Sequence, residues 1–326
     1  MTNYHFGIEI EVLVEPHRIR APLDHALYYD KLSKSLRKRG LKAVANDLQP
    51  GGRRKRPDLY DKWWITRDGS LDNSGANIGK MLLSFMIKAN QLLTSRLSVP
   101  MEAVSPVMNC RATWESEIDT FWKAMSAVFH MPQRSPKCGS HIHISNTGAK
   151  SFSLDQLKTI AFGVVLYEPL ISECLMSIRT TNGYCQPNSA ASTKLRSCGG
   201  PSDMARLIRG ATNRDDLVEV MQDDRRVLWN FENVVRGKSG TIEFRGGRCL
   251  RGPVRTKRWI AFAVALIHAI LDMRQNDLSH PSSPTLQGNK FTAAGLYSKV
   301  KSAARSLAMA ELLPDDYRVL NESRNS

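Results

Sequence analysis

Three short stretches of the chain each place two ionisable side chains two residues apart, in contexts that favour β-strands. On a strand, residues i and i+2 point to the same face, so each pair presents its two side chains together. The residues between them are apolar and would lie on the opposite face. The three pairs are Glu9 and Glu11, His141 and His143, and Glu243 and Arg245. If these strands share one sheet, one of its faces carries three glutamates, two histidines and an arginine.

Carboxylates buried side by side are costly unless a cation neutralises them. Glu102, near the end of another predicted strand, is a natural fourth carboxylate, and four glutamates match the charge of two divalent ions. Oxygen-rich ligation with one imidazole suits Mg²⁺ or Mn²⁺ better than Zn²⁺. Two such ions beside basic residues favour the handling of a nucleoside triphosphate. The sequence has neither a P-loop nor a dinucleotide-binding glycine motif, so ATP would be held through metals and arginines.

The composition narrows the class of partner. The 326 residues carry a formal net charge of +15, which favours partners with phosphates or carboxylates. Six cysteines without a C-x-x-C give no support for a zinc knuckle or a redox pair. The longest apolar run, 259–271, is shorter than the roughly 20 residues of a membrane span. The N-terminus lacks a signal-peptide pattern, so we expect a soluble, cytoplasmic protein without a membrane partner.

The hydrophobic pattern predicts strands that alternate irregularly with helices. We expect strands at 6–12, 63–65, 102–106 (an edge strand ended by Pro106), 141–145, 226–233 and 240–246. We expect helices at 23–45, 78–97, 113–130, 153–175, 204–221, 254–272 and 291–313. Because no regular βαβ order appears, the pattern predicts an α+β fold with an antiparallel or mixed sheet and helices on one face.

The domain organisation follows from the same pattern. No internal repeat is visible, so we expect one domain over 1–326. The polar segment 180–201 is expected to be a mobile loop over a site, and 276–290 a Pro/Ser-rich connection to a C-terminal helix. The basic run 53–56 is most simply a solvated loop, with nucleic-acid binding as the alternative. Trp63 and Trp64 are expected to be one core residue and one residue at the site or its rim.

Five motifs in order make the pattern specific. They are Phe6-Gly-Ile-Glu9-Ile-Glu11, Trp64-Ile-Thr-Arg-Asp68-Gly-Ser70, Glu102-Ala-Val-Ser-Pro106, Cys138-Gly-Ser-His141-Ile-His143, and Asn230 with Thr241-Ile-Glu243-Phe-Arg245. This order resembles the amidoligase family, carboxylate–amine ligases related to glutamine synthetase and glutamate–cysteine ligase. The matching blocks run from residue 6 to about 252. The resemblance implies a curved, half-barrel sheet of the glutamine-synthetase type, with helices on its convex face and with ATP and two Mg²⁺ on its concave face.

The resemblance also implies roles for individual residues. Glu9 and Glu11 would lie on the two metals, and Glu102 would ligate one of them near the amine. His141 would bind the metal nearest the ATP phosphates together with Glu243, and His143 would approach the phosphates or the substrate. The transferring phosphoryl group would be stabilised by Arg245.

Substrate contacts are implied for Asp68, Ser70, Trp64 and Asn230. After Arg245 the chain departs from the family pattern, which leaves Arg248 and Arg251 as further candidates for phosphate contact.

The leading hypothesis is therefore an ATP- and Mg²⁺-dependent ligase that forms an amide or isopeptide bond through an acyl phosphate. Small-molecule or amino-acid-derived substrates are expected, and a peptide or protein acceptor is the alternative within this class. A metal-dependent hydrolase or nuclease would use the same Glu/His face, with the positive charge serving nucleic acid. A third alternative, a catalytically silent binding module, is disfavoured by the complete set of candidate ligands.

Overall fold

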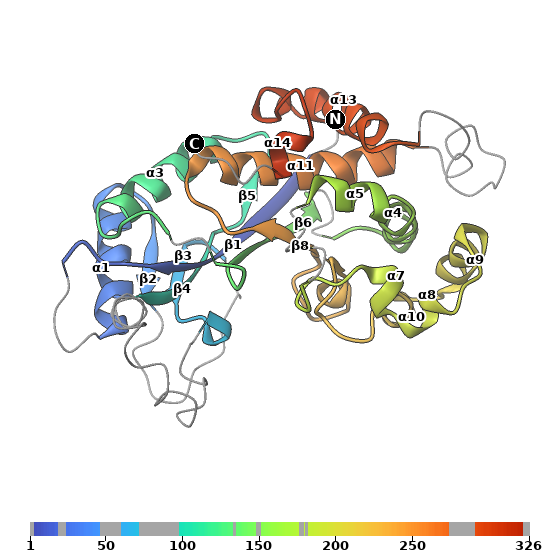
Figure 1. Cartoon of the computed structure of the whole chain (residues 1–326), viewed down its shortest axis with the longest axis horizontal. Coiled ribbons are helices and arrows are strands. Elements are labelled where there is room, and N and C mark those ends of the chain that lie inside the picture. Colours follow the sequence, from blue (N-terminus) through green and yellow to red (C-terminus); the bar gives the residue numbers. More distant parts are fainter. Residues whose placement is uncertain are drawn as a thin grey trace, which may run out of the picture.

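The computed structural model describes residues 3–18, 24–45, 60–71, 98–132, 135–147, 151–175, 179, 182–273 and 291–321. These residues form an α+β fold around an open, mixed sheet of eight strands (Figure 1). The strands are β1 (Tyr4–Val14), β2 (Ala43–Ala45), β3 (Trp63–Thr66), β4 (Val99–Val104), β5 (Met108–Asn109), β6 (Gly139–Asn146), β7 (Trp229–Asn230) and β8 (Ile242–Arg248). The predicted α+β class with a mixed sheet is thereby confirmed.

Helices cover one face of the sheet and extend beyond its end (Figure 1). They are α1 (His25–Lys38), α3 (Trp114–Ser126), α4 (Leu154–Leu166), α5 (Glu168–Cys174), α7 (Asn188–Ala191), α8 (Thr193–Arg196), α9 (Pro201–Gly210), α10 (Arg214–Met221), α11 (Pro253–Asp272), α13 (Ala293–Ser306) and α14 (Arg318–Asn321). Short 3₁₀ turns are η1 (Gly69–Leu71), η3 (Glu232–Val234) and η4 (Ala310–Leu312). No helix in the described ranges is both long and apolar enough to cross a membrane.

The strand order is β2-β3-β4-β1-β6-β8-β7, with β5 pairing to the first residues of β1. Every neighbouring pair is antiparallel except β2 and β3, which are parallel. The three strands that carry the ionisable pairs, β1, β6 and β8, are therefore adjacent at the centre of the sheet. The predicted site requires that the ionisable side chains of these three strands lie on the same face of the sheet.

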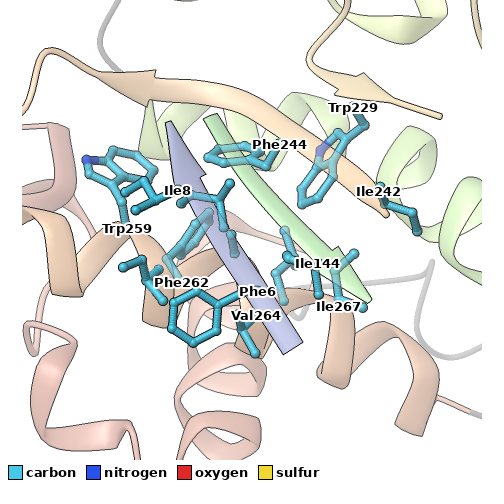
Figure 2. Close-up of a cluster of buried hydrophobic side chains, with 14 of the residues drawn as sticks. Phe6, Ile8, Ile144, Trp229, Ile242, Phe244, Trp259, Phe262, Val264 and Ile267 are labelled. Carbon is cyan, nitrogen blue, oxygen red and sulfur yellow. The ribbon is translucent and has the colours of Figure 1, made fainter. Parts of the chain in front are cut away.

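The opposite face of these strands is the hydrophobic core (Figure 2). Phe6 and Ile8 of β1 and Phe244 of β8 are buried there. The Phe244 ring stacks on Trp259 of α11 with centroids 5.9 Å apart, and Phe6 meets Trp114 of α3 edge-on at 5.2 Å. Burying each large apolar side chain contributes about 1.5–3 kcal/mol. The alternation along each strand thus fixes which residues face the site, because a one-residue slip would expose the core side chains.

The predicted helix over 23–45 is wrong in its length. The observed helix, α1, ends at Lys38, and the last residues of the predicted range, Ala43–Ala45, form strand β2 instead. Gly40 adopts a left-handed φ of +86°, its N–H donates to the carbonyl of Arg37, and the N–H of Leu41 donates to that of Leu36. This pair of hydrogen bonds is a Schellman motif, which ends a helix and turns the chain away from its axis.

The predicted edge position of the 102–106 strand is also wrong. β4 lies between β3 and β1, with Glu102 opposite both Thr66 and Glu11. The proline that suggested an edge, Pro106, follows the last paired residue of β4, so its missing N–H costs no ladder hydrogen bond. The position of β4 in the sheet depends on its pairing with strands that are distant in the sequence, and the local amino-acid composition of β4 does not indicate that pairing.

Two predicted helices are divided. The predicted Ser153–Gln156 capping box at the start of the first is confirmed. This helix ends at Leu166, and a second helix, α5, begins beside Pro169, because a proline cannot continue the preceding helix. The 204–221 helix is two helices, α9 and α10. The basic run 53–56, the helix over 78–97 and the connection 276–290 lie outside the described residues. Within 180–201 the structure describes α7 and α8, and the mobility of that loop stays a prediction.

Candidate active site

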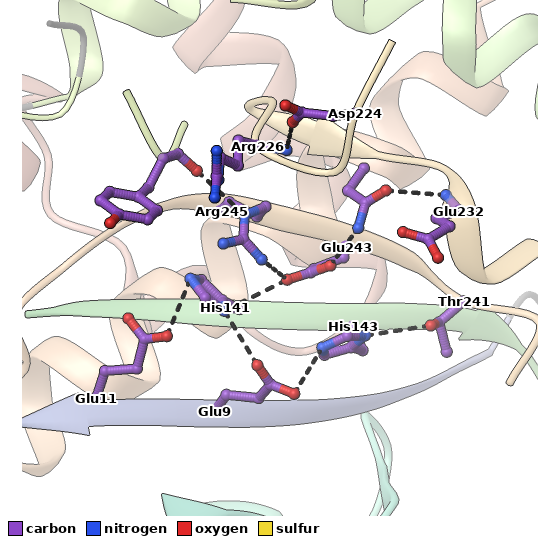
Figure 3. A network of polar contacts seen from close by, with 12 residues as sticks. Glu9, Glu11, His141, His143, Asp224, Arg226, Glu232, Thr241, Glu243 and Arg245 are labelled. Atoms are coloured by element: carbon purple, nitrogen blue, oxygen red, sulfur yellow. Dashed lines mark hydrogen bonds and ion pairs between the residues drawn. The ribbon is translucent and has the colours of Figure 1, made fainter. Parts of the chain in front are cut away.

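Six polar side chains converge on the sheet face opposite the core (Figure 3). We call them the acid–imidazole cluster: Glu9, Glu11, His141, His143, Glu243 and Arg245. The register explains the convergence, because Glu9 pairs with His141 across β1 and β6, and His143 pairs with Glu243 across β6 and β8. The geometric condition stated from the sequence is therefore met.

His141 is the centre of the cluster. Its Nδ1 lies 3.0 Å from Oε2 of Glu9 and 3.3 Å from Oε1 of Glu243, and its Nε2 lies 3.7 Å from Oε1 of Glu11. The His141 side chain is only 5% exposed. Burial by itself lowers the pKa of this imidazole, but the surrounding carboxylates, Glu11 and Glu9 foremost, raise it above its ordinary value. The imidazole therefore lies where the three carboxylates meet, in a position that favours its protonated form.

His143, predicted to approach the phosphates or the substrate, belongs to a group of side chains that could hold a metal ion. Its Nδ1 is within 3.2 Å of Oγ1 of Thr241, while its buried Nε2 makes no hydrogen bond among the described residues and lies 3.3 Å from Oε1 of Glu9. One ligand atom each from Glu9, His143 and Glu243 lie within 4.8 Å of one another. Two carboxylates and one imidazole fit Mg²⁺ or Mn²⁺.

Glu243 and Arg245 form a buried ion pair beside this group. Nη1 of Arg245 lies 2.6 Å from Oε1 of Glu243, and the two side chains are 12% and 5% exposed. Burial raises the pKa of Glu243, but the two imidazoles and Arg245 outweigh it and hold that pKa below its ordinary value. The carboxylate of Glu243 is therefore ionised, as a metal ligand must be.

Asn230 fixes the other oxygen of Glu243. Its Nδ2 donates to Oε2 of Glu243 at 2.7 Å, while its own Oδ1 accepts a hydrogen bond from Gln222 at 2.7 Å. The residue is only 3% exposed. This geometry supports a positioning role for Asn230, and its contact with substrate stays a prediction. Gln222 has no motif around it and could not be found from the sequence.

A second residue that sequence reasoning missed is Arg179, which lies between α5 and α7. It is 3% exposed, and its Nη2 donates to the backbone carbonyl of Arg245 at 2.6 Å. Its buried Nε finds no hydrogen-bond partner among the described residues. A Cβ on Gly139 would lie 3.1 Å from Oε2 of Glu11 and 3.2 Å from Nη1 of Arg179. Gly139 thus leaves the space in which a guanidinium and a carboxylate approach the end of β6.

A β-bulge controls where Arg245 and Arg248 lie. Ser140 pairs with Gly247 and Ile142 with Phe244, so two residues of β8 stand opposite His141. Gly247 has to be glycine because a Cβ there would overlap Oγ and the carbonyl oxygen of Ser140. Beyond the bulge, Arg248 pairs with Gly139. Arg179, Arg245 and Arg248 therefore gather near one end of the cluster, which we call the arginine end.

Three further residues predicted to contact substrate or phosphate, Asp68, Ser70 and Arg251, do not belong to the acid–imidazole cluster. Asp68 and Ser70 form a turn in which the Ser70 N–H donates to Oδ1 of Asp68 at 2.8 Å. Oδ2 of Asp68 is buried without a hydrogen-bond partner in the part of the chain that is described. Asp68 also contributes to the raised pKa of Glu11, after the larger effect of burial. Arg251 is engaged elsewhere, since its Nε donates to the carbonyl of Pro132 at 2.8 Å.

The two tryptophans divide as predicted. Trp63 is fully buried and stacks on Phe121 with centroids 4.2 Å apart. Trp64 pairs with Val104, which pairs with Glu9, so it lies on the face of the cluster. Its indole N–H has no hydrogen-bond partner within the described ranges. Glu102, opposite Glu11, is on the same face and 8% exposed.

A cavity of about 90 Å³ opens at the other end of the cluster, next to Glu9 and His143. Gly7, which follows Phe6 in the first motif, lies opposite His143 and contributes no side chain to fill it. Ser105, Ser145, Ser239 and Thr241 also line the cavity, together with apolar residues such as Val104 and Val107. The site thus has an arginine end, a carboxylate–imidazole centre and a small, mainly apolar hollow.

Comparisons with known proteins agree with this geometry. The model of a family described as "Putative amidoligase enzyme" matches residues 2–267, which include all six residues of the acid–imidazole cluster. A comparison with curated proteins found no match.

Proposed function

We propose an ATP- and Mg²⁺-dependent carboxylate–amine ligase activity for this chain, which belongs to the amidoligase family. The observation that carries the proposal is the convergence of the acid–imidazole cluster, which includes Arg245, with two further arginines, Arg179 and Arg248. The substrates proposed are a small-molecule or amino-acid-derived carboxylic acid and an amine. We also propose that the sheet is a half-barrel of the glutamine-synthetase type with its concave face toward the cluster.

The donor set fits a pair of divalent ions. Glu9, His143 and Glu243 would hold one ion, and Glu11 with Glu102 opposite it would hold the second. His141, within 3.0–3.7 Å of Glu9, Glu243 and Glu11, would complete either group. When bound, such ions supply charge neutralisation for a triphosphate. The Nε2 of His143, which faces Oε1 of Glu9 at 3.3 Å, and the ionised state of Glu243 both support ligation.

The arginine end suits the transferred phosphoryl group. Arg245 is held by Glu243 and by the backbone carbonyl of Tyr184, which its Nε reaches at 3.2 Å. Arg179 is buried, and its Nε–H has no hydrogen-bond partner among the residues that the structure describes. Pre-oriented guanidinium groups stabilise the charge that spreads over the phosphoryl oxygens, without reorganisation during transfer. Arg248 remains a candidate for the same role, and the position of Arg251 supports a structural one.

The proposed reaction has two steps. An oxygen of the carboxylic acid attacks the γ-phosphorus of ATP, the bond to the bridging oxygen breaks, and ADP leaves. The amine nitrogen then attacks the acyl carbon, the C–O bond to phosphate breaks, and the amine gives up a proton. We propose Oδ2 of Asp68 as the acceptor of that proton, since it is buried, carries no hydrogen bond among the described residues and adjoins Glu11.

The activity is tested by incubating the full chain with ATP, Mg²⁺ and pooled acids and amines, with mass detection of condensed products and of ADP. Hydroxylamine added to the acids alone traps an acyl phosphate as a hydroxamate. Arg245→Met is expected to lower turnover about 10²–10³-fold, as loss of one transition-state donor does elsewhere. Asp68→Asn is expected to keep hydroxamate formation and to lose amide formation, because the base acts only in the second step.

The matched control is Glu232→Gln, an exposed carboxylate paired with Lys238 near the site. It is expected to leave turnover unchanged. Cleavage of DNA or RNA with Mg²⁺ and without ATP would replace the ligase proposal by the hydrolase one. Condensation onto added peptides and not onto small amines would move the acceptor to the peptide class.

A further inference from the structure

Two cysteines far apart in the sequence meet at the end of the central sheet. Cys138 directly precedes Gly139 of β6, and Cys249 directly follows Arg248 of β8. Since Gly139 and Arg248 are antiparallel partners, Cys138 and Cys249 occupy the next opposed positions. Opposed residues in antiparallel strands have Cα atoms about 4.5–5.5 Å apart, within the about 4.4–6.8 Å that a disulfide spans.

The two cysteines belong to the same small hydrophobic cluster. Cys138 is buried in a cluster with Leu13 and Leu71 that is separate from the main core, and Cys249 packs against this cluster while remaining partly exposed. Both cysteines are in the free thiol form. The pair therefore combines one buried cysteine with one that is partly exposed.

Exposure favours Cys249 as the nucleophile of the pair, because it is partly exposed whereas Cys138 is buried. The neighbouring Cys138, helped by Arg251 and Arg248 against the effect of burial, also lowers the pKa of Cys249. Burial chiefly raises the pKa of each of the other isolated cysteines, Cys110, Cys174, Cys185 and Cys198. A thiolate reacts with oxidants, whereas a buried thiol does not.

We propose that Cys138 and Cys249 are an oxidation site that closes to an intrachain disulfide on reaction with a hydroperoxide. The Cys249 sulfur attacks one peroxide oxygen, the O–O bond breaks, and a sulfenic acid forms as water or an alcohol leaves. The Cys138 sulfur then attacks the sulfenic sulfur, the S–S bond forms, and a second water carries away the hydroxyl and the thiol proton. Two thiols are oxidised and one peroxide is reduced.

This inference is independent of the proposed function, because it uses no group of the acid–imidazole cluster. Its position nonetheless links the redox state of the protein to the arginine end. Cys138 is one residue from Gly139, over which Glu11 and Arg179 lie, and Cys249 is one residue from Arg248.

The experiment uses the full chain, reduced and then freed of reductant, and treated with hydrogen peroxide. Free thiols are blocked with N-ethylmaleimide before proteolysis without reductant. A single linked peptide pair containing Cys138 and Cys249 is expected, lighter than the two reduced peptides together by two hydrogen atoms. Dithiothreitol should restore both free thiols. The proposal would be overturned by a linked pair of other cysteines. It would also be overturned if Cys249 were oxidised to a sulfinic acid while Cys138 of the folded protein remained a thiol.

Matched variants separate this pair from general oxidation. Cys249→Ser is expected to abolish the linked peptide, whereas Cys198→Ser, a change at another partly exposed cysteine, should leave it at the wild-type yield. Thermal melts establish that each variant is folded. If Cys249→Ser does not fold, the initial rate of N-ethylmaleimide labelling of the wild-type protein decides: Cys249 must react faster than Cys198.

Discussion

Replacing Glu243 by glutamine keeps the size of the side chain and removes one buried charge at the centre of the cluster. Arg245, only 12% exposed and 2.6 Å from Oε1 of Glu243, loses the ionic partner that compensates its burial. Loss of one partner from a buried ion pair costs about 3–5 kcal/mol. Glutamine still offers a carbonyl oxygen to Arg245, so we expect the lower end, a loss of about 3 kcal/mol in the free energy of unfolding without metal.

The pH dependence of this loss carries a definite sign. Glu243 has a pKa below its ordinary value of 4.5 in the folded protein, chiefly because the imidazoles and Arg245 outweigh burial. Its charge therefore stabilises the folded state above pH 4.5, and this contribution disappears as the pH falls through the folded-state pKa. The difference in stability between wild type and variant should be full at neutral pH and shrink in acid.

Urea denaturation at a series of pH values measures the loss in the free energy of unfolding and its dependence on pH. Melting curves with and without Mg²⁺ measure binding of the metal. Glu232→Gln is the control, since its exposed ion pair with Lys238 contributes about 0–1 kcal/mol. Mg²⁺ should raise the melting temperature of the control and of the wild type, but not that of Glu243→Gln. A Glu243→Gln protein as stable as the control, with the same Mg²⁺ response, would refute both the ion-pair argument and the metal assignment.

Three further predictions concern the scaffold. Ser153→Ala removes the capping box with Gln156 at the start of α4 and should lower the free energy of unfolding by about 1 kcal/mol in urea titrations. Gly247→Ala forces a Cβ into Ser140 at the β-bulge and should cost about 3 kcal/mol or more, measured in the same way. Burial lowers the pKa of His268 below its ordinary 6.5, so its neutral form stabilises the fold above that pH and stability falls as the pH drops below it. His268→Gln should flatten that part of the profile of stability against pH.

Each of these predictions has a contrary outcome. An unchanged urea midpoint for Ser153→Ala would mean that the capping hydrogen bonds contribute nothing to the fold. Wild-type stability for Gly247→Ala would mean that the bulge can open without cost. An unaltered pH profile for His268→Gln would assign the acid sensitivity to other groups.

The centre of the site was predictable because it follows from period-two alternation. Glu9, His141 and Glu243 share a face whenever their strands pair, and the apolar residues between them fix the register. The arginine end was predictable only in part. Arg179 comes from a polar segment without periodicity, and it reaches the cluster because glycine stands at position 139. Such close approaches depend on tertiary packing, which no local pattern encodes.

The same distinction explains the errors in the fold. Alternation identified β4 as a strand, but its place between β3 and β1 depends on pairing with residues far away in the chain. Leucine spacing continued the first helix past Gly40, where the left-handed backbone ends it. The pairing of Cys138 with Cys249 is invisible to a search for closely spaced cysteines, because the antiparallel register of β6 and β8 creates it.

The position of β1 at the centre of the sheet has a consequence for synthesis on the ribosome. β1 begins at Tyr4, whereas its partners β6 and β8 begin at Gly139 and Ile242. At translation rates of about 5–20 residues per second, the nascent β1 waits on the order of ten seconds before β6, which carries His141 and His143, emerges, and longer before β8. Until β6 emerges, the glutamates of β1 have no imidazole beside them, and the apolar side chains from Phe6 to Val12 lack the cover that later elements such as α11 provide. The complete acid–imidazole cluster therefore forms only after β8 has been synthesised, and chaperone binding to the first strand is the expected safeguard until then.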